Sequence, residues 1–414
     1  MPAHRWQIAF AFLVAVVALA GRIAHAQSYG VEIGNTLMPA SGGMGGTSVA
    51  RPQDMLSGIN ANPATLTQFR GTQFVLSGAF VGSTMDLTQS GPAPLIGVTP
   101  FSAKSGTPGT VVPNIGVSQE LSAYGLPVTL GIALIGSAGA GTSFLNQPQS
   151  NGTSSYLLIL DFAPSVGVRL TDRLAIGATM FVGDGYLDGP FVGTSAMTNA
   201  FALRAGLGMS YQLTEFTTLG AYWQSRQRFK FRDQVILFND SAPRDVTLAL
   251  PDQFGLGIAN SRFMDGRLLL AADVLHLQWK TADLFQDIYR NQWVMQLGTQ
   301  YAISNRVRLR AGYALAQNPI DGNTGTSVDG IPLPGGIPAV KYLQAQFGVV
   351  NEHRMSLGMG VSNVLPGVDF DVLAGGMFPA SEQYGAFTSS TLNSYWVGAG
   401  LTWRFGRGAC RGVN

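Results

Sequence analysis

Few side chains in this sequence could carry out covalent chemistry, and they are widely separated. The chain has 4 histidines and 1 cysteine, Cys410, which rules out a disulfide framework or a cysteine-rich metal site within it. No nucleophile elbow, H-E-x-x-H helix or phosphate-binding loop occurs. His276, and Ser356 near His353, are isolated pieces of a possible lipid hydrolase. We therefore expect no enzyme, no cofactor and no metal, with a hydrolase as the least favoured alternative.

Three arginines are the candidate groups for binding an anion. In Val307–Tyr313 the residues alternate, so Arg308 and Arg310 share one face of an extended strand and apolar side chains take the other. Arg204 stands in the same relation to its apolar neighbours. Because a guanidinium group matches a carboxylate in shape and charge, we expect these residues to contact a ligand headgroup, with Arg204 the first choice. Ordinary internal ion pairs are the alternative.

The composition excludes several classes of protein. Of the 414 residues 12% are charged, about half the usual share, and a net charge of +2 gives no sign of a nucleic-acid partner. The first 26 residues are typical of a cleaved export signal, with His4 and Arg5, the apolar run 8–20 and the small-residue site Ala24-His25-Ala26. Beyond it no apolar run reaches the roughly 18 residues that a membrane-spanning helix needs.

Apolar and other residues instead alternate in segments of about ten, the pattern of a transmembrane β-barrel. We expect about fourteen antiparallel strands near residues 72–86, 111–122, 126–137, 155–170, 173–184, 199–213, 215–232, 245–262, 266–280, 291–303, 305–317, 345–362, 367–378 and 393–405. Short turns alternate with longer connections, as in bacterial outer-membrane barrels, which indicates an outer-membrane location. A soluble β-sandwich or propeller is the alternative.

Aromatic residues give a check on strand length. Trp293 and Tyr301 are eight residues apart on one face, as are Tyr395 and Trp403. Eight residues span roughly 26 Å, which matches the apolar band of about 25 Å between the two aromatic girdles of an outer-membrane barrel. The last strand ends in Phe405, a possible signal for the barrel-assembly machinery.

The segment before the first strand does not alternate and predicts a plug. Residues 42–50 are small and uncharged, and residues 54–66 contain short helical pieces with Asn60 or Asn62 as N-cap and Pro63 at the first helical position. A fourteen-strand barrel is too wide for its own side chains to fill, so something must close it. We expect a signal peptide (1–26), a hatch (27–70), a barrel (71–405) and a C-terminal extension (406–414).

The stretch "GMGGTSVARPQDMLSGINANPATLTQF" resembles the N-terminal hatch of the FadL-type outer-membrane transporters of long-chain fatty acids and aromatic hydrocarbons. The shared features are the small-residue run 42–46, Asp54, Asn62-Pro63-Ala64 and Leu66. Further similar stretches are "PDQFGLGIA", "LLLAADVLHLQW", "VRLRAGYALAQNP" and "HRMSLGMGV". The resemblance implies a passive channel for hydrophobic small molecules, whose cargo leaves sideways through a gap where the third strand kinks.

Glycines mark the place where that kink is expected. Gly136, Gly139 and Gly141 stand at the end of the predicted third strand, and glycine in a strand often marks a bulge or bend. A flexible loop root is the alternative. The family's capture groove uses helical third and fourth outer loops, which are short here (185–198 and 233–244). We therefore expect an apolar lip in the loop Thr281–Asn291, formed by three residues at helical spacing: Leu284, Phe285 and Ile288.

The expected partners are an apolar ligand, outer-membrane lipid and lipopolysaccharide, and the barrel-assembly machinery, with the protein itself a monomer. Strand parity places four cations of the seventh strand on the inward face, at its outer end where lipopolysaccharide phosphates could also reach them: Arg226, Arg228, Lys230 and Arg232. A structural or adhesin barrel without transport is the remaining alternative.

Overall fold

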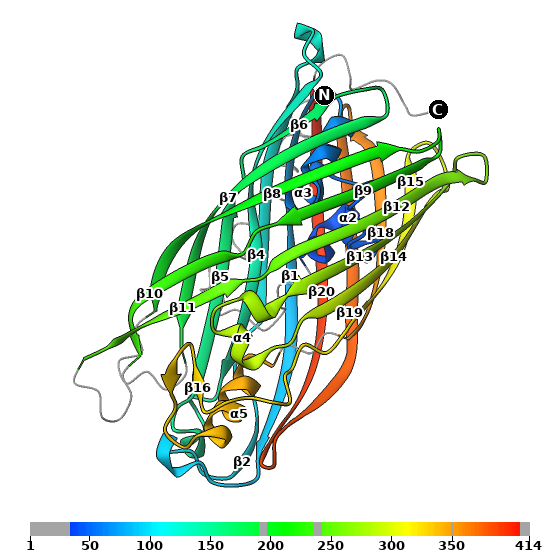
Figure 1. The fold of residues 1–414 in the computed structure, drawn as a ribbon. Helices are drawn as coiled ribbons and strands as arrows, with labels where there is room; N and C mark the ends of the chain where they lie inside the picture. The colour runs from blue at the N-terminus through cyan, green and yellow to red at the C-terminus, as the bar shows by residue number, and fades with distance from the viewer. Residues whose placement is uncertain (1–33, 190–196, 236–241, 349–351, 406–414) are drawn as a thin grey trace, which may run out of the picture.

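The computed structural model describes residues 34–189, 197–235, 242–348 and 352–405, and its main element is a closed antiparallel barrel of 14 strands (Figure 1). The strands are β1 (Thr72–Gln89), β3 (Thr110–Glu120), β4 (Val128–Ser143), β5 with β6 (Ser154–Phe162 and Ser165–Arg169), β7 (Leu174–Asp188), β8 (Thr198–Gln212), β9 (Thr217–Gln224), β12 (Asp252–Phe263), β13 (Leu268–Gln278), β14 (Gln292–Ala302), β15 (Val307–Ala316), β18 (His353–Leu365), β19 (Val368–Tyr384) and β20 (Thr388–Phe405). The barrel closes because β1 pairs with both β3 and β20. The predicted fold class is confirmed, and the predicted segments 1–26 and 406–414 lie outside the described residues.

The strands alternate because their two faces meet different surroundings. On β8 Phe201 and Leu203 are 68% and 65% exposed on the outside, while Ala202 and Arg204 between and beside them are buried inside. Such an apolar outer face is what hydrocarbon requires of a strand. No helix in the part of the chain that the structure describes is long and apolar enough to span a membrane.

Three predicted strands are interrupted. The fourth breaks at Ala163-Pro164 and the eighth at Pro251, which separates β11 (Arg244–Leu250) from β12, because proline cannot donate a ladder hydrogen bond. The seventh breaks at Ser225-Arg226, between β9 and β10 (Gln227–Val235), and β10 pairs with β11 as a hairpin.

The break at Ser225-Arg226 shifts the side-chain parity by one residue. Even-numbered residues such as Tyr222 and Gln224 are buried on β9, whereas Phe229 and Phe231 are buried on β10. The prediction that the four cations of this strand face inward is therefore wrong, and they are exposed on the outer face. A one-residue shift exchanges the two faces of a strand.

Helices lie inside both ends of the barrel. The hatch contains η1 (Gly34–Leu37), α2 (Pro39–Gly42), α3 (Met55–Asn60) and η2 (Pro63–Gln68), near the end where β1 begins. Elements of the outer connections are β2 (Phe101–Lys104), η3 (Pro94–Ile96), η5 (Pro148–Ser150), η6 (Trp279–Thr281), α4 (Phe285–Ile288), β16 (Ser327–Val328), β17 (Ile331–Pro332) and α5 (Ile337–Gln346), whereas η4 (Ser122–Tyr124) lies in a turn at the hatch end. Figure 1 shows α2 and α3 near one end of the barrel and α4 and α5 toward the other. The twelfth strand begins at His353 rather than near 345, because α5 extends to Gln346.

Candidate functional site

Asp54 organises the hatch from within. It is the N-cap of α3, where its Oδ1 accepts hydrogen bonds from Ser57 N (2.7 Å) and Ser57 Oγ (2.9 Å). Its Oδ2 accepts from Ser41 N and Ser41 Oγ, both at 3.2 Å. Burial raises the pKa of the Asp54 carboxyl, while these hydrogen bonds oppose the shift. Asp54 thus caps α3, whereas Asn60, one of the two residues expected to be an N-cap, ends that helix.

Asn62 joins the hatch to the barrel wall. It is the N-cap of η2, where its Oδ1 accepts a hydrogen bond from Ala64 N at 3.2 Å and Pro63 takes the first helical position. Its Nδ2 donates to Val49 O in the hatch (2.7 Å) and to Met209 O on β8 (2.9 Å). The side chain is fully buried. Asn62 therefore starts the helix and fastens it to the wall at the same time.

A belt of inward-facing glycines lets the hatch backbone lie directly on the wall. The glycine belt comprises Gly177, Gly208, Gly220, Gly257, Gly298 and Gly312. Its members form three cross-strand pairs, Gly177 with Gly208, Gly220 with Gly257, and Gly298 with Gly312. A Cβ on Gly312 would lie 1.9 Å from Gly45 N, and one on Gly220 would lie 2.1 Å from Val49 O. Only glycine fits such a close approach of two backbones. Sequence reasoning missed this belt.

Polar residues of the wall bind the hatch backbone, and sequence reasoning missed their role too. Asp273 Oδ2 on β13 accepts hydrogen bonds from Ser48 N (2.7 Å) and Val49 N (3.0 Å). Ser356 Oγ accepts one from Gly45 N at 3.0 Å. Because one side-chain oxygen accepts hydrogen bonds from two successive buried backbone N–H groups, Asp273 is a major anchor of the hatch.

The residues considered for hydrolysis do not assemble. Ser356 faces the hatch, whereas His353 is exposed on the opposite face of β18, where its Nδ1 lies 2.6 Å from Tyr313 Oη. His276 packs against the ring of Trp293 with a centroid distance of 4.3 Å. Within the described residues no group of three or more His, Cys, Asp or Glu side chains could hold a metal ion.

We expect Asn62→Asp to loosen the hatch. The carboxylate keeps the acceptor for Ala64 N–H but loses both amide donors, so the carbonyls of Val49 and Met209 each lose their hydrogen bond from Asn62. The cost is roughly 2–4 kcal/mol, because a buried polar group without its hydrogen bond is expensive. Limited proteolysis of the folded barrel should cut the hatch faster than in the parent protein. Asn60→Asp is the control, since within the described residues Asn60 Nδ2 donates only to Asn35 Oδ1. Equal cleavage rates in all three proteins would contradict the assignment.

The two C-terminal arginines lie on the turn side of the hatch. Arg310 Nη1 pairs with Asp371 Oδ1 at 2.5 Å and its Nε donates to Gln300 Oε1 at 2.7 Å. Arg308 Nη1 donates to Ser362 Oγ at 3.3 Å. Both line a polar cavity of about 150 Å³ beside Asp54. The hatch therefore lies between them and the outer loops.

Arg204 lies on the other side of the hatch. It is buried, and its Nε donates to Ser225 O (2.6 Å) and its Nη2 to Pro251 O (3.0 Å), the points where the seventh and eighth strands break. It lines a polar cavity of about 50 Å³ together with Asp161 and Ser137. The structure thus does not bring the three arginines to one place.

The third strand contains the predicted kink residues, but it is longer than predicted and has a bulge beside them. β4 continues to Ser143 instead of ending near 137, and Ser137 is bulged between Gly136 and Ala138 in the ladder with β5. The ladder with β3 ends at the pair Asn114 and Ile135. By cross-strand register with β5 the glycines at 136, 139 and 141 share the outward face, yet all three are buried.

The outer half of β4 lies on the inner side of β3, toward the barrel interior. A Cβ on Gly136 would lie 2.4 Å from Val112 Cγ1 and 3.7 Å from Val112 Cβ, although Val112 points inward from β3. The two strands overlap here instead of pairing edge to edge. Further out, Gly106 N donates to Ser143 O at 2.8 Å and rejoins the strand to the wall. We call the overlap between Val112 and Gly136 the β4 window.

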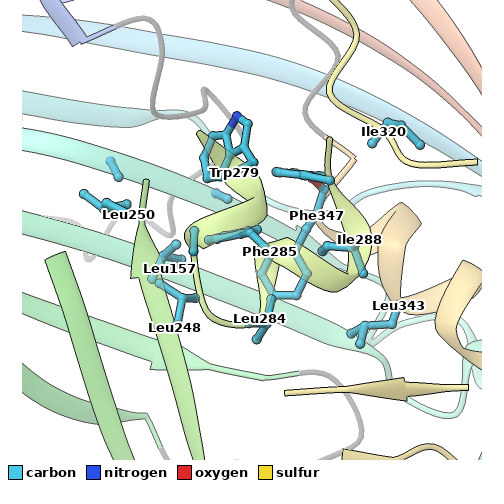
Figure 2. Close-up of a cluster of buried hydrophobic side chains, with 14 of the residues drawn as sticks. Leu157, Leu248, Leu250, Trp279, Leu284, Phe285, Ile288, Ile320, Leu343 and Phe347 are labelled. Atoms are coloured by element: carbon cyan, nitrogen blue, oxygen red, sulfur yellow. The ribbon is translucent and has the colours of Figure 1, made fainter. Parts of the chain in front are cut away.

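The residues expected to form an apolar lip are buried. Figure 2 shows Leu284, Phe285 and Ile288 within an apolar group inside the outer half of the barrel. We call this group the outer apolar cluster; its labelled members are Leu157, Leu248, Leu250, Trp279, Leu284, Phe285, Ile288, Ile320, Leu343 and Phe347. Leu284, Phe285 and Ile288 are 6%, 4% and 0% exposed, so the interpretation as an open lip is wrong. The loop folds inward because its apolar side chains gain more by packing than by facing water.

Solved structures of other proteins share this architecture, although sequence comparisons find no relative. No protein-family model matches the sequence, and no curated protein matches it. The fold is similar to the toluene transporter TodX of P. putida, with a TM-score of 0.65, 20% identity and coverage of 92% of this chain and 99% of that chain. For the toluene transporter TbuX of Ralstonia pickettii the TM-score is 0.63 and the identity 18%, over 89% of this chain and 98% of that chain. For a Pseudomonas aeruginosa FadL homologue the TM-score is 0.62 and the identity 16%, over 89% of this chain and 98% of that chain. The chain has the fold of the FadL-type outer-membrane channels.

Proposed function

We propose that this protein is an outer-membrane channel through which hydrophobic small molecules diffuse passively and leave sideways at the β4 window. One observation carries the proposal: the hatch is bound to the wall at β8 by Asn62 and at β13 by Asp273, while β4 stops pairing with β3 beyond Asn114 and Ile135. Sideways release into hydrocarbon spares an apolar cargo the passage through water. The similar structures named toluene transporters support an apolar cargo.

The outer apolar cluster is the proposed first binding region. Its residues come from α4, α5 and the adjoining wall, so a cargo would replace apolar contacts that these side chains make with one another. The end of α5 also contacts the kinked strand, because Thr142 Oγ1 donates to Gln346 Oε1 at 2.7 Å. Movement of α5 on ligand binding would therefore act directly on β4.

Arg204 is the proposed contact for a carboxylate headgroup. Its Nε and Nη2 are occupied, but no acceptor within the described residues binds its Nη1, and the side chain lines the polar cavity between the outer apolar cluster and the hatch. A fatty acid would thus meet the outer apolar cluster with its chain and Arg204 with its head. Arg308 and Arg310 could act only on a cargo that had passed the hatch.

The test is uptake of labelled oleate and labelled toluene by cells with and without the protein. We expect both to enter faster with it, and deletion of residues 27–70 to raise leakage of both by removing the hatch. Arg204→Met should lower oleate uptake several-fold and leave toluene uptake unchanged, which separates the headgroup contact from the channel itself. Equal uptake of both ligands in all strains would contradict transport and favour a structural or adhesin barrel.

A further inference from the structure

Four cations form an exposed stripe along the outward face at the start of β10: Arg226, Arg228, Lys230 and Arg232. The side chains of Arg228 and Lys230 are 63% and 62% exposed. At steps of two residues the cationic stripe spans roughly 20 Å. The parity shift at Ser225 turns it outward, because the other orientation would bury four charges where Phe229 and Phe231 now pack.

Carboxylates neutralise only part of the cationic stripe. Arg228 Nε lies 3.0 Å from Asp283 Oδ2, and Lys230 Nζ lies 2.8 Å from Asp245 Oδ2. Arg226 Nη1 donates to Thr281 O at 3.2 Å, and Arg232 shares the single carboxylate of Asp245 with Lys230 through a longer-range attraction. Surface ion pairs of this kind contribute little stability, so an anionic ligand can displace them.

The cationic stripe lies at the level where the apolar wall ends. Gln227 Nε2 donates to Ala202 O at 3.3 Å, which fixes the start of β10 beside the outer half of β8. There Leu203 and Phe201 are among the most exposed apolar side chains of the barrel, and Asn199 is the last residue of β8 on that face, with Met197 in the connection before the strand. This change from apolar to polar is the change expected where membrane hydrocarbon meets the headgroups.

We propose that the cationic stripe binds the phosphate groups of a phosphorylated glycolipid of the outer leaflet, whose acyl chains lie on the apolar wall of β8 beneath it. The inference rests on the outer-membrane location in the proposed function. Guanidinium and ammonium groups are the usual protein partners of phosphate. Basic side chains at the membrane surface each add to the attraction for anionic lipid. An apolar wall directly below a row of cations fits both halves of such a lipid.

The test is lipid retention by the purified full-length protein, counted by native mass spectrometry. The protein in detergent is incubated with diphosphorylated lipid A or with lipid A from which both phosphates were removed. We expect the parent protein to retain the phosphorylated form, and the variant with all four cations changed to Gln to retain less of it, by on the order of tenfold. Arg262→Gln with Arg306→Gln, two exposed cations near turns at the other end of the barrel, is the control and should retain lipid normally.

Heat-modifiable mobility on gels shows whether each variant is a folded barrel. Equal retention by parent and variant would overturn the proposal, as would equal retention of the dephosphorylated lipid or full displacement by inorganic phosphate at the concentration of the lipid. The result is independent of transport: a protein that retains the lipid but takes up neither oleate nor toluene would refute the proposed channel alone.

Discussion

A disulfide across the β4 window should abolish uptake. In Val112→Cys with Gly136→Cys the two Cβ atoms would be 3.7 Å apart, within the range of disulfide geometry. The bond would fix β4 against β3 at the point where the ladder has ended. With Cys410 changed to Ser, we expect the oxidised protein to lose most toluene and oleate uptake, by on the order of tenfold, and to regain it on reduction. The reason is that a covalently closed overlap leaves no sideways path between the strands.

A matched disulfide separates window closure from cross-linking in general. Gly376 and Tyr395 are cross-strand partners on β19 and β20, and a Cβ on Gly376 would lie 3.9 Å from Tyr395 Cβ. Their strands are already joined by a ladder on both sides of this pair, so a disulfide there should leave uptake unchanged. If the window disulfide also left uptake unchanged, the cargo would have to pass through the hatch instead, and the lateral route would be refuted.

The barrel could be predicted from the sequence because each strand has two faces in different surroundings. Alternation alone places Arg204 inside and Phe201 outside, and the structure agrees. Alternation predicted the wrong face for Arg228 and Lys230, because Ser225-Arg226 contains no proline or glycine that would indicate a break in the strand. A charge argument would have succeeded, since the cost of burying those cations beside Phe229 exceeds the cost of one irregular residue.

The hatch motif could be recognised in the sequence, but the wall residues that contact the hatch were not picked out. Asn62 and Asp54 stand out in the sequence by their positions before short helices. The structure adds the hydrogen bond of Asn62 to Met209 O on the wall and that of Asp54 to Ser41 N within the hatch. The glycine belt could have been found by asking which inward-facing positions at one depth are all glycine. The outer apolar cluster could not be found this way, because helical spacing in Leu284 and Phe285 says which face is apolar and not what covers it.

Replacing one glycine of the belt should unseat the hatch. In Gly312→Val the new Cβ would lie 1.9 Å from Gly45 N and 2.1 Å from Met44 C, so the clash is with backbone and not with a flexible side chain. Gly45 N is also held by Ser356 Oγ, which restricts its retreat. We expect a loss of about 3 kcal/mol in hatch binding, the upper end of the usual cost of overpacking, because backbone atoms must move. A barrel without its seated hatch should conduct ions in planar bilayers and admit large antibiotics that the parent excludes.

A lipid-facing glycine provides the control for this substitution. Gly78→Val on β1 places the same branched side chain in a strand, but the nearest atom to its Cβ is Val112 O at 3.4 Å, an ordinary contact. It should therefore fold and stay closed, because β-branched residues suit exposed strand positions. Gly312→Ala gives a milder clash if the valine variant fails to assemble, and it should raise conductance less. A folded Gly312→Val barrel as tightly closed as Gly78→Val would show that the hatch is not seated by backbone contact with the glycine belt.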